Sequence, residues 1–306
     1  MSEEQPVTVD RVAFVLNPAS GGGGGDNTFL AIARELRQHD VHVAAFETYK
    51  DGGAVPSVEE ALRAGFEDIW VIGGDGTIQQ TLEPIVGAEA VLGPIPGGTG
   101  NSLVRVIGHT VDDPVAEARW LMHQPATRID IGDCNGHLFS VRLGIGFEAA
   151  AAEEVEDEKS GLGNLAYIVA GVETAGDFVP TQMRLSAGDE SVYEGQAFAA
   201  MFTNMPLRAL VNIPGLESGD PLSGVLHAII VREQPKVRSI WRWLTSRPNL
   251  GSEDNVFVYS APAYHVETSD GTPVHADGET LGEMREMDVV CRPRALRIRG
   301  LELRGM

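Results

Sequence analysis

Three short apolar segments in the first hundred residues each run directly into a glycine-rich turn. These segments are Val12–Leu16, Ile69–Ile72 and Val91–Ile95, and each has the length and composition of a buried strand. The carboxyl ends of parallel strands share one edge of a sheet, which is where such sheets bind their ligands. Glycines let a ligand approach the main chain closely, and the amides that open a helix favour anions. The pattern therefore predicts a parallel α/β sheet with an anion site at that edge.

The turn at Gly73–Thr77 holds a carboxylate within this anion-friendly setting. Its sequence is Gly-Gly-Asp-Gly-Thr, and the residues from Ile78 onward can continue as a helix. A carboxylate beside a phosphate is repulsive unless a metal ion or a transferable proton lies between them. Asp75 therefore indicates phosphoryl transfer assisted by Mg²⁺.

Each glycine-rich segment has an ordinary alternative explanation when it is taken alone. Gly-Gly-Asp-Gly and Pro-Gly-Gly-Thr-Gly are common turn compositions, and the five-glycine run Gly21–Gly25 is typical of a flexible loop. What favours a binding site is that all three follow apolar strands of one predicted sheet.

The secondary-structure pattern changes along the chain. Up to about residue 125, strand-like segments (Val12–Leu16, Val41–Phe46, Ile69–Ile72, Val91–Ile95) alternate with helical ones (Thr28–Gln38, Ser57–Ala64, Thr77–Val86, Asp113–Met122). The later segments are mostly strand-like: Arg128–Gly132, Leu138–Leu143, Gln182–Ala187, Tyr193–Phe202, Val225–Val231, Val256–Tyr259, His265–Glu267 and Met287–Arg292. Two helical pieces, Glu148–Glu158 and Leu162–Gly176, interrupt them. This order predicts an α/β N-terminal lobe followed by a β-rich sandwich lobe.

The charge of the chain is strongly negative. The 44 acidic and 23 basic residues give a net charge of −21, and the only lysines are Lys50, Lys159 and Lys236. We interpret this acidic, lysine-poor composition as adaptation to a salt-rich cytoplasm, where screening weakens self-repulsion; an ordinary acidic protein is the alternative. Nucleic-acid binding is disfavoured, because it requires a basic surface.

The remaining composition excludes several other classes. Two cysteines, Cys134 and Cys291, provide neither a disulfide framework nor a metal pattern, and the eight histidines have no zinc-site spacing. No apolar run is long enough to cross a bilayer, and the acidic N-terminus does not resemble a signal peptide. We expect a cytoplasmic protein, with or without peripheral contact to a membrane. The sequence does not distinguish a monomer from a homodimer.

Five motifs together resemble the diacylglycerol kinase catalytic family, which includes bacterial soluble lipid kinases, sphingosine kinases and ceramide kinases. They are Asn17-Pro-Ala-Ser-Gly, Gly73-Gly-Asp-Gly-Thr, Pro96-Gly-Gly-Thr-Gly-Asn, Gly144-Ile-Gly-Phe-Glu and Asp277-Gly-Glu, and the resemblance runs from about Arg11 to about Arg299. It implies an NAD kinase-like nucleotide-binding lobe at 1–127 and a β-sandwich acceptor lobe at 128–294. It also implies that the final segment, about 295–306, returns to the first lobe. The implied activity is transfer of the γ-phosphate of ATP, with Mg²⁺, to a hydroxyl of diacylglycerol or a related lipid alcohol.

The resemblance also assigns roles to individual residues. Asp75 and Glu279 are the candidate catalytic carboxylates at the cleft between the lobes; Glu279 is the preferred base and Asp75 the metal or phosphate organiser, although the reverse stays open. Asp75 and Asp277 are the candidate metal ligands. Without the resemblance, Asp277–Glu279 is an ordinary β-turn between strands. The candidate nucleotide-binding residues are Asn17, Ser20, Gly21, Gly22, Gly73, Gly74, Gly76, Thr77, Gly97, Gly98, Thr99 and Asn101.

Two further features concern charge neutralisation and the acceptor. Arg105, one helical turn after Asn101, is a candidate phosphate ligand or a surface charge. The segment Lys236–Arg247 carries Trp241, Trp243 and four basic residues but no acid, which suits contact with a membrane surface. A connecting helix with buried tryptophans is the alternative for this segment.

The sequence departs from the family pattern in two places. Ser102 stands where the family commonly has Asp, and Ser223-Gly224 with Leu226-His227 stands where acidic residues often help to hold a structural Mg²⁺. The first departure leaves the lipid acceptor open, and the second leaves the structural Mg²⁺ open. Two other functions also stay open: an NAD kinase-like phosphotransferase, and a catalytically weak nucleotide-binding sensor.

Overall fold

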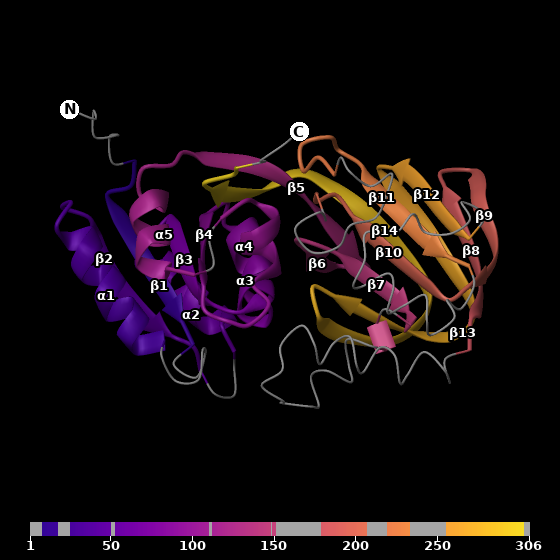
Figure 1. The fold of residues 1–306 in the computed structure, drawn as a ribbon, viewed down its shortest axis with the longest axis horizontal. Coiled ribbons are helices and arrows are strands. Elements are labelled where there is room, and N and C mark those ends of the chain that lie inside the picture. Colours follow the sequence, from indigo (N-terminus) through magenta and orange to yellow (C-terminus); the bar gives the residue numbers. More distant parts are fainter. Residues whose placement is uncertain are drawn as a thin grey trace. The chain divides into compact units, whose positions relative to one another are not determined.

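The computed structural model describes residues 8–17, 25–49, 53–109, 112–147, 149–150, 179–206, 219–232 and 255–302. The chain forms two compact units (Figure 1). Unit 1 comprises Met1–Ile129 together with Arg294–Met306, and unit 2 comprises Asp130–Pro293.

Unit 1 is built on a parallel sheet in the order β4-β3-β1-β2. Its strands are β1 (Arg11–Leu16), β2 (His42–Glu47), β3 (Asp68–Gly73) and β4 (Val91–Pro96). Strands β1, β3 and β4 are buried along nearly their whole length, which explains why they read as continuous apolar runs. The parallel pairing brings their carboxyl ends to one edge, as the sequence predicted.

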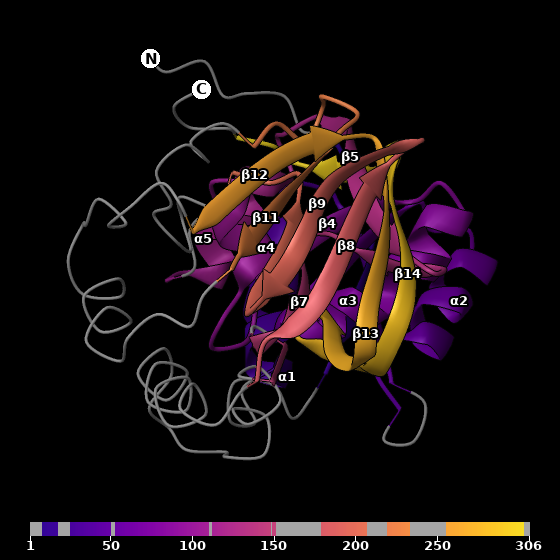
Figure 2. The same cartoon turned by 90° about the vertical axis from the view of Figure 1, so that its right-hand side faces the viewer.

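Helices cover both faces of this sheet. They are α1 (Gly25–Arg37), α2 (Val55–Arg63), α3 (Asp75–Gly87), the short α4 (Ser102–Val106) and α5 (Pro114–Leu121). Helices α1 and α5 pack on the face formed by Val12, Phe14 and Leu16, whereas α2 packs against α3; Figure 2 shows α5 and α2 on opposite sides. Helix α5 begins where the Asp113 side chain accepts hydrogen bonds from the amides of Val115 and Ala116, both at 3.0 Å.

The end of the long strand β14 (Glu279–Arg299) completes unit 1. Arg297 and Ile298 pair in parallel with Val91 and Leu92 of β4. Next to this pairing, the buried Arg299 side chain binds Asp68 at the start of β3. Two segments more than two hundred residues apart in sequence are thereby joined in one core.

Unit 2 is an antiparallel β structure whose main sheet has the order β12-β11-β10-β7-β13-β14, with the β8–β9 hairpin beside β13 and β5 and β6 paired with each other. The strands are β5 (Ala126–Cys134), β6 (His137–Phe139), β7 (Leu143–Gly146), β8 (Thr181–Ala187), β9 (Glu190–Ala197), β10 (Ala199–Thr203), β11 (Leu226–Val231), β12 (Val256–Ala261) and β13 (Ala263–Ala276). Their inward side chains form one hydrophobic core that includes both free cysteines. The predicted fold class, an α/β unit followed by a β-rich unit, is confirmed.

Some predicted elements differ from the structure. The predicted strand Leu138–Leu143 is broken between β6 and β7, because residues 140–142 turn to bind Asp277. The predicted strand Tyr193–Phe202 is broken at Phe198, whose amide donates to Val231 and whose ring stacks on Phe147. Helix α4 is an element that periodicity did not predict, since it has only five residues.

Other predictions fall outside the described part of the chain. The predicted helix 162–176 and the basic segment 236–247 lie wholly outside it, and so does the predicted helix 148–158 apart from residues 149 and 150. None of the helices in the described residues has the length and apolar character needed to cross a membrane.

Candidate functional site

Two glycine-rich loops of unit 1 lie in direct backbone contact. The amide of Gly97, after β4, donates to the carbonyl of Gly73, at the end of β3, at 3.0 Å. A Cβ atom on Gly97 would lie 2.8 Å from the Gly73 nitrogen, and one on Gly98 would lie 2.5 Å from the Gly74 Cα. Only glycine permits this approach, so these glycines set the geometry of the edge whether or not a ligand is bound.

Asp75 opens helix α3 and points onto the second loop. Its Oδ1 accepts a hydrogen bond from the Ser102 amide at 2.5 Å, and its Oδ2 lies 3.3 Å from the Ser102 hydroxyl. Its Oδ2 is also the atom that a Cβ on Gly100 would meet, at 2.4 Å. The carboxylate thus joins the loop after β3 to the loop after β4, at the N-terminal ends of two helices, where a negative charge is favoured.

Asn101 and Arg105 shape the second loop from within. Asn101 adopts a left-handed backbone with φ of 50°, and its side chain accepts from the Gly98 amide at 3.0 Å and donates to the Gly98 carbonyl at 2.7 Å. The Nε of Arg105 donates to the Gly100 carbonyl at 2.9 Å. Both side chains therefore hold the loop in place in this structure, which is a structural role that the sequence pattern did not reveal.

The other candidate nucleotide residues lie near these two loops or outside the described chain. The Asn17 amide lies 3.4 Å from the Ile72 carbonyl, so the end of β1 meets the end of β3. Thr77 packs beside Gly73, and Thr99 is exposed. Gly76 has open space around its Cα. Ser20, Gly21 and Gly22 fall outside the described residues.

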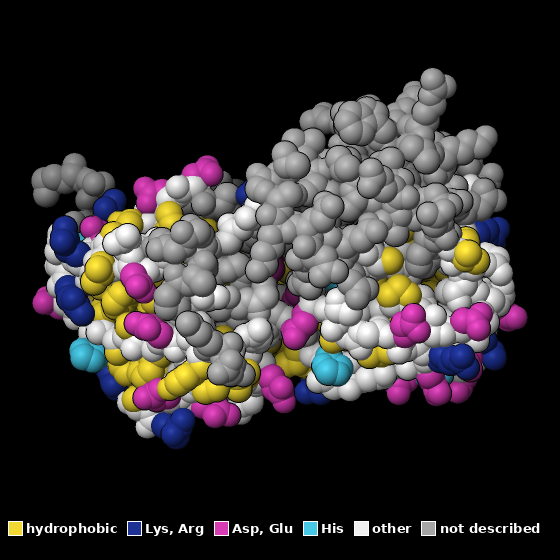
Figure 3. All heavy atoms as spheres, turned by 90° about the horizontal axis from the view of Figure 1, so that it is seen from below, with side chains coloured by type: hydrophobic (Ala, Val, Ile, Leu, Met, Phe, Trp, Pro, Cys, Tyr) yellow, Lys and Arg dark blue, Asp and Glu magenta, His cyan; other side chains and the backbone are white. Residues whose placement is uncertain are grey.

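An exposed aromatic residue at this edge was missed by the sequence reasoning. Tyr49 follows β2 and forms two backbone hydrogen bonds with Gly53. With Leu30 and Val55 it makes up the large exposed hydrophobic residues of the described part of unit 1. The face drawn in Figure 3 shows hydrophobic side chains of unit 1 gathered among scattered acidic ones. Its position directly after a strand could have marked Tyr49 as a residue of this edge. The residues around it have no distinctive composition, so the sequence alone did not single it out.

In unit 2, Asp277 and Gly278 form the turn that joins β13 to β14. Their φ angles of 52° and 97° and the pairing of Ala276 with Glu279 define a two-residue hairpin. The Asp277 carboxylate accepts four hydrogen bonds from residues 140–142, at 2.6 to 2.9 Å. Glu279, the next residue but one, is exposed at the start of β14.

The two candidate metal ligands differ in how well they suit Mg²⁺. Mg²⁺ in kinase sites is held by one or two carboxylates together with phosphate oxygens, so a single organised carboxylate such as Asp75 fits that donor set. Asp277 fits it less well, because four donors from residues 140–142, three of them main-chain amides, already occupy its two oxygens. Within the described ranges, no cluster of three or more His, Cys, Asp or Glu side chains could hold a metal by itself.

Comparisons with known proteins agree with this architecture. Residues 11–134 match the diacylglycerol kinase catalytic domain, and residues 141–300 match the YegS C-terminal NAD kinase β-sandwich-like domain. A Pseudomonas aeruginosa protein named probable lipid kinase YegS-like is 32% identical over 295 residues, covering 94% of each chain. The diacylglycerol kinase of Bacillus subtilis is 28% identical over 277 residues, covering 88% of this chain and 89% of its own.

Solved structures show the same fold. A diacylglycerol kinase from Bacillus anthracis superposes with a TM-score of 0.70 at 19% identity, covering 96% of this chain and 97% of its own. An NAD kinase from Archaeoglobus fulgidus, solved in complex with ATP, superposes with a TM-score of 0.51 at 12% identity, covering 96% and 94%. The architecture therefore defines a protein of the NAD kinase-like fold class. Within that class, the chain belongs to the YegS-like lipid kinase family, whose members carry the diacylglycerol kinase catalytic domain.

Proposed function

We propose that this protein transfers the γ-phosphate of ATP to a hydroxyl of diacylglycerol or a related lipid alcohol. The observation that carries the proposal is the Asp75 carboxylate, held by Ser102 where two glycine loops touch. A carboxylate fixed between two glycine-rich loops suits phosphoryl transfer better than simple anion binding, because a carboxylate beside a phosphate needs a cation or a proton between them.

The phosphates of ATP bind to the backbone of the glycine loops in this proposal. The residues involved are those of 73–77 and 97–101, with Asn17 at the end of β1, and Ser20, Gly21 and Gly22 from the loop after β1. Lysine is nearly absent from the chain, so backbone amides, arginine and the metal ion share the charge neutralisation. Mg²⁺, when bound, would be held by Asp75 and phosphate oxygens and would offset the charge that develops on the phosphates.

Glu279 is the proposed general base. In the reaction, the acceptor oxygen forms a bond to the γ-phosphorus while the bond from that phosphorus to the bridging oxygen of ADP breaks. The proton of the acceptor hydroxyl passes to the Glu279 carboxylate, and ADP leaves with the electron pair. Exposure of Glu279 at the first residue of β14 leaves its carboxylate accessible to a substrate hydroxyl.

The test is transfer of labelled γ-phosphate from ATP and Mg²⁺ to a total lipid extract at low and high salt. We expect a labelled lipid with the native protein and roughly 10²–10⁴-fold less with Asp75→Ala or Glu279→Ala, a range typical of lost acid–base or positioning groups. Asp112→Ala is the control for Asp75→Ala, because Asp112 is an exposed carboxylate of the same unit. Glu283→Ala is the control for Glu279→Ala, because Glu283 is an exposed carboxylate on the same strand, β14. Full activity in both catalytic variants would refute the assignment. No labelled lipid with a folded, ATP-binding protein would refute the lipid acceptor.

Peripheral membrane contact through 236–247 is a separate part of the proposal. It rests on Trp241 and Trp243, and on the four basic residues that this segment carries without any acidic residue in an otherwise acidic chain. Sedimentation with anionic liposomes should show less binding by the Trp241→Ala, Trp243→Ala double variant than by the native protein. Equal binding would remove the membrane role and leave the segment as a buried connection.

A further inference from the structure

We propose that Asp277 is a positioning residue that fixes the Glu279 turn onto the loop between β6 and β7. The proposal deepens the proposed function, on which it rests for the role of Glu279. It replaces the metal-ligand prediction for Asp277 with a different physical task.

The first observation is the number and geometry of the contacts. Oδ2 of Asp277 accepts from the Ser140 amide at 2.6 Å and from the Ser140 hydroxyl at 2.7 Å. Oδ1 accepts from the amides of Val141 at 2.9 Å and Arg142 at 2.8 Å. The Asp277 amide also donates to the Arg142 carbonyl at 2.9 Å. Hydrogen bonds to an ionised acceptor are the strong ones, so this is a firm link between positions about 135 residues apart.

The second observation is that the receiving loop is itself anchored. Ser140 and Val141 are each 2% exposed. The buried hydroxyl of Thr203, on β10, donates to the Val141 carbonyl at 2.6 Å. Strand β7, which follows the loop, pairs with β13, so that Leu143 lies opposite Ala276. The carboxylate therefore binds to a rigid part of the unit 2 core.

The third observation is the turn that Asp277 controls. Both turn residues have positive φ, and the Gly278 amide donates to Nδ1 of the fully buried His275 at 3.1 Å. A register shift between Val274 and His275 precedes the turn, so the ladder of hydrogen bonds alone does not fix it. Glu279 leaves the turn directly, and its backbone position follows from the placement of Asp277 two residues earlier.

The same contacts argue against a metal at Asp277. The hydrogens of three amides and one hydroxyl converge on the carboxylate, and a cation would have to displace them or face their positive ends. Glu279 carries no comparable set of contacts and is exposed. The turn therefore carries a fixed carboxylate at Asp277 and an accessible carboxylate at Glu279, with Gly278 between them.

The experiment compares Asp277→Asn with the native protein in three measurements. Asparagine keeps the shape of the aspartate side chain but replaces one acceptor oxygen with an NH₂ group. That group faces the donors of residues 140–142 and cannot accept their hydrogen bonds. We expect kcat to fall at least tenfold, while the KM for ATP and the Mg²⁺ concentration for half-maximal activity stay within about twofold, since an open turn misplaces a base without touching nucleotide or metal. A large rise in the Mg²⁺ requirement, or an unchanged kcat, would overturn the proposal. Asp189→Asn, in the exposed β8–β9 turn, is the matched control.

Two additional measurements keep the proposal testable on its own. In a Glu279→Gln background, Asp277→Asn should cost no further rate, because a positioning residue acts only through the group it positions; an additional loss would overturn the role. Amide hydrogen exchange of residues 139–142 should speed up at least tenfold in Asp277→Asn. Unchanged protection there would overturn the proposal that Asp277 fixes the turn onto this loop. Hydrogen exchange needs no lipid acceptor. It therefore distinguishes failure of the positioning role of Asp277 from failure of the proposed lipid kinase activity. If Asp277→Asn does not fold, Ser140→Ala removes one donor only and should lower kcat in the same direction.

Discussion

The Ser102 amide donates to Oδ1 of Asp75 at 2.5 Å, and the Ser102 hydroxyl lies 3.3 Å from Oδ2. Ser102 is the first residue of α4, and Asp75 is the first residue of α3. The amide contact depends only on the backbone, whereas the hydroxyl contact depends on the side chain. The two contributions can therefore be separated by substitution.

Ser102→Ala should leave Asp75 placed by the amide but less constrained at Oδ2. We expect kcat for phosphoryl transfer to fall by about three- to tenfold, in line with about 1 kcal/mol for one hydrogen bond. Ser102→Thr keeps a hydroxyl and should recover most of the rate. Exposed Ser191→Ala is the control. Equal rates for Ala and Ser at position 102 would show that the Ser102 hydroxyl does not help to position Asp75.

Gly76→Ala tests whether glycine at this position serves the stability of the fold or the binding of ATP. A Cβ at Gly76 would meet nothing within 4 Å, and its φ is not positive, so the fold does not require glycine there. Alanine in α3 should even raise the free energy of unfolding, by up to about 1 kcal/mol. If phosphate approaches this backbone, the affinity for ATP should fall at least tenfold with no loss of melting temperature.

Gly87→Ala is the matched control for that comparison. Gly87 closes the same helix and also has open space around it, but it lies away from the loops. Calorimetric titration with ATP, together with thermal unfolding, measures both effects. Unchanged ATP affinity in Gly76→Ala would move the phosphate site away from the start of α3.

Local pattern predicted much of the fold in advance. Strands β1, β3 and β4 are continuous apolar runs because parallel strands inside a sheet are buried on both faces. The predicted bounds of these three strands and of β2 lie within one residue of the observed ones. The break between β6 and β7 could not be predicted, because residues 140–142 leave the strand to bind a carboxylate about 135 residues later. No local signal encodes a contact of that range.

The candidate site was predicted unevenly for the same reason. The positions of the glycine-rich turns after β3 and β4 could be predicted, since composition and position after a strand are local properties. The nucleotide role of Asn101 stays a prediction, and the hydrogen bonds of its side chain to Gly98 within the same loop needed the structure. The sequence also flagged Ser102 only as a departure from a pattern; its contact with Asp75, 27 residues away, needed the structure.

Arg299 should be essential for attaching the end of β14 to unit 1. Its Nε and Nη2 bind Oδ1 of Asp68 at 2.7 and 2.6 Å, and its Nη1 donates to Thr8 and Gln124. Burial raises the pKa of Asp68, and Arg299 opposes that shift. Arg299→Ala should therefore lower the free energy of unfolding by about 3–5 kcal/mol, because it leaves a buried charge without its partner.

Two comparisons test the electrostatic origin of that loss. A protonated Asp68 needs no cation, so the destabilisation should shrink as the pH falls toward 4. The double variant Arg299→Met, Asp68→Asn should recover much of the stability, whereas Arg297→Ala, which removes one hydrogen bond to Glu89, should cost about 1 kcal/mol or less. A pH-independent loss in Arg299→Ala would show that lost packing, not the unpaired carboxylate, is responsible.

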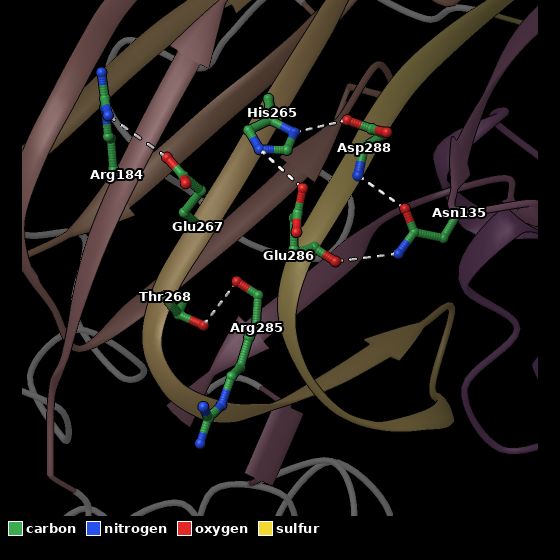
Figure 4. Close-up of polar contacts among 8 residues, drawn as sticks. All are labelled: Asn135, Arg184, His265, Glu267, Thr268, Arg285, Glu286 and Asp288. Atoms are coloured by element: carbon green, nitrogen blue, oxygen red, sulfur yellow. Dashed lines mark hydrogen bonds and ion pairs between the residues drawn. The ribbon is translucent and has the colours of Figure 1, made fainter.

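His265 should give unit 2 a small stability term that disappears at alkaline pH. Figure 4 shows its ring between Asp288 and Glu286, with Nδ1 2.8 Å from Asp288 Oδ1 and Nε2 3.6 Å from Glu286 Oε1. The hydrogen bond to Asp288 raises the pKa of His265, and the charges of Asp288, Glu286 and Glu267 add to the shift. A raised pKa in the folded state stabilises the fold fully below the unfolded value of 6.5, and this stabilisation is lost as the pH rises through the folded value.

The magnitude is modest because the ring is more than a third exposed, at 37%. Solvent screening limits the contribution to about 0.5 kcal/mol, and 1 M salt should reduce it further. Unfolding followed between pH 6 and 8 should show a decline in stability that is flatter in His265→Gln, with His137→Gln as an exposed control on β6. In Asp288→Asn, NMR titration should give a lower pKa for His265. An unchanged pKa there would mean that the summed charge of this acidic surface, rather than the hydrogen bond to Asp288, holds the proton.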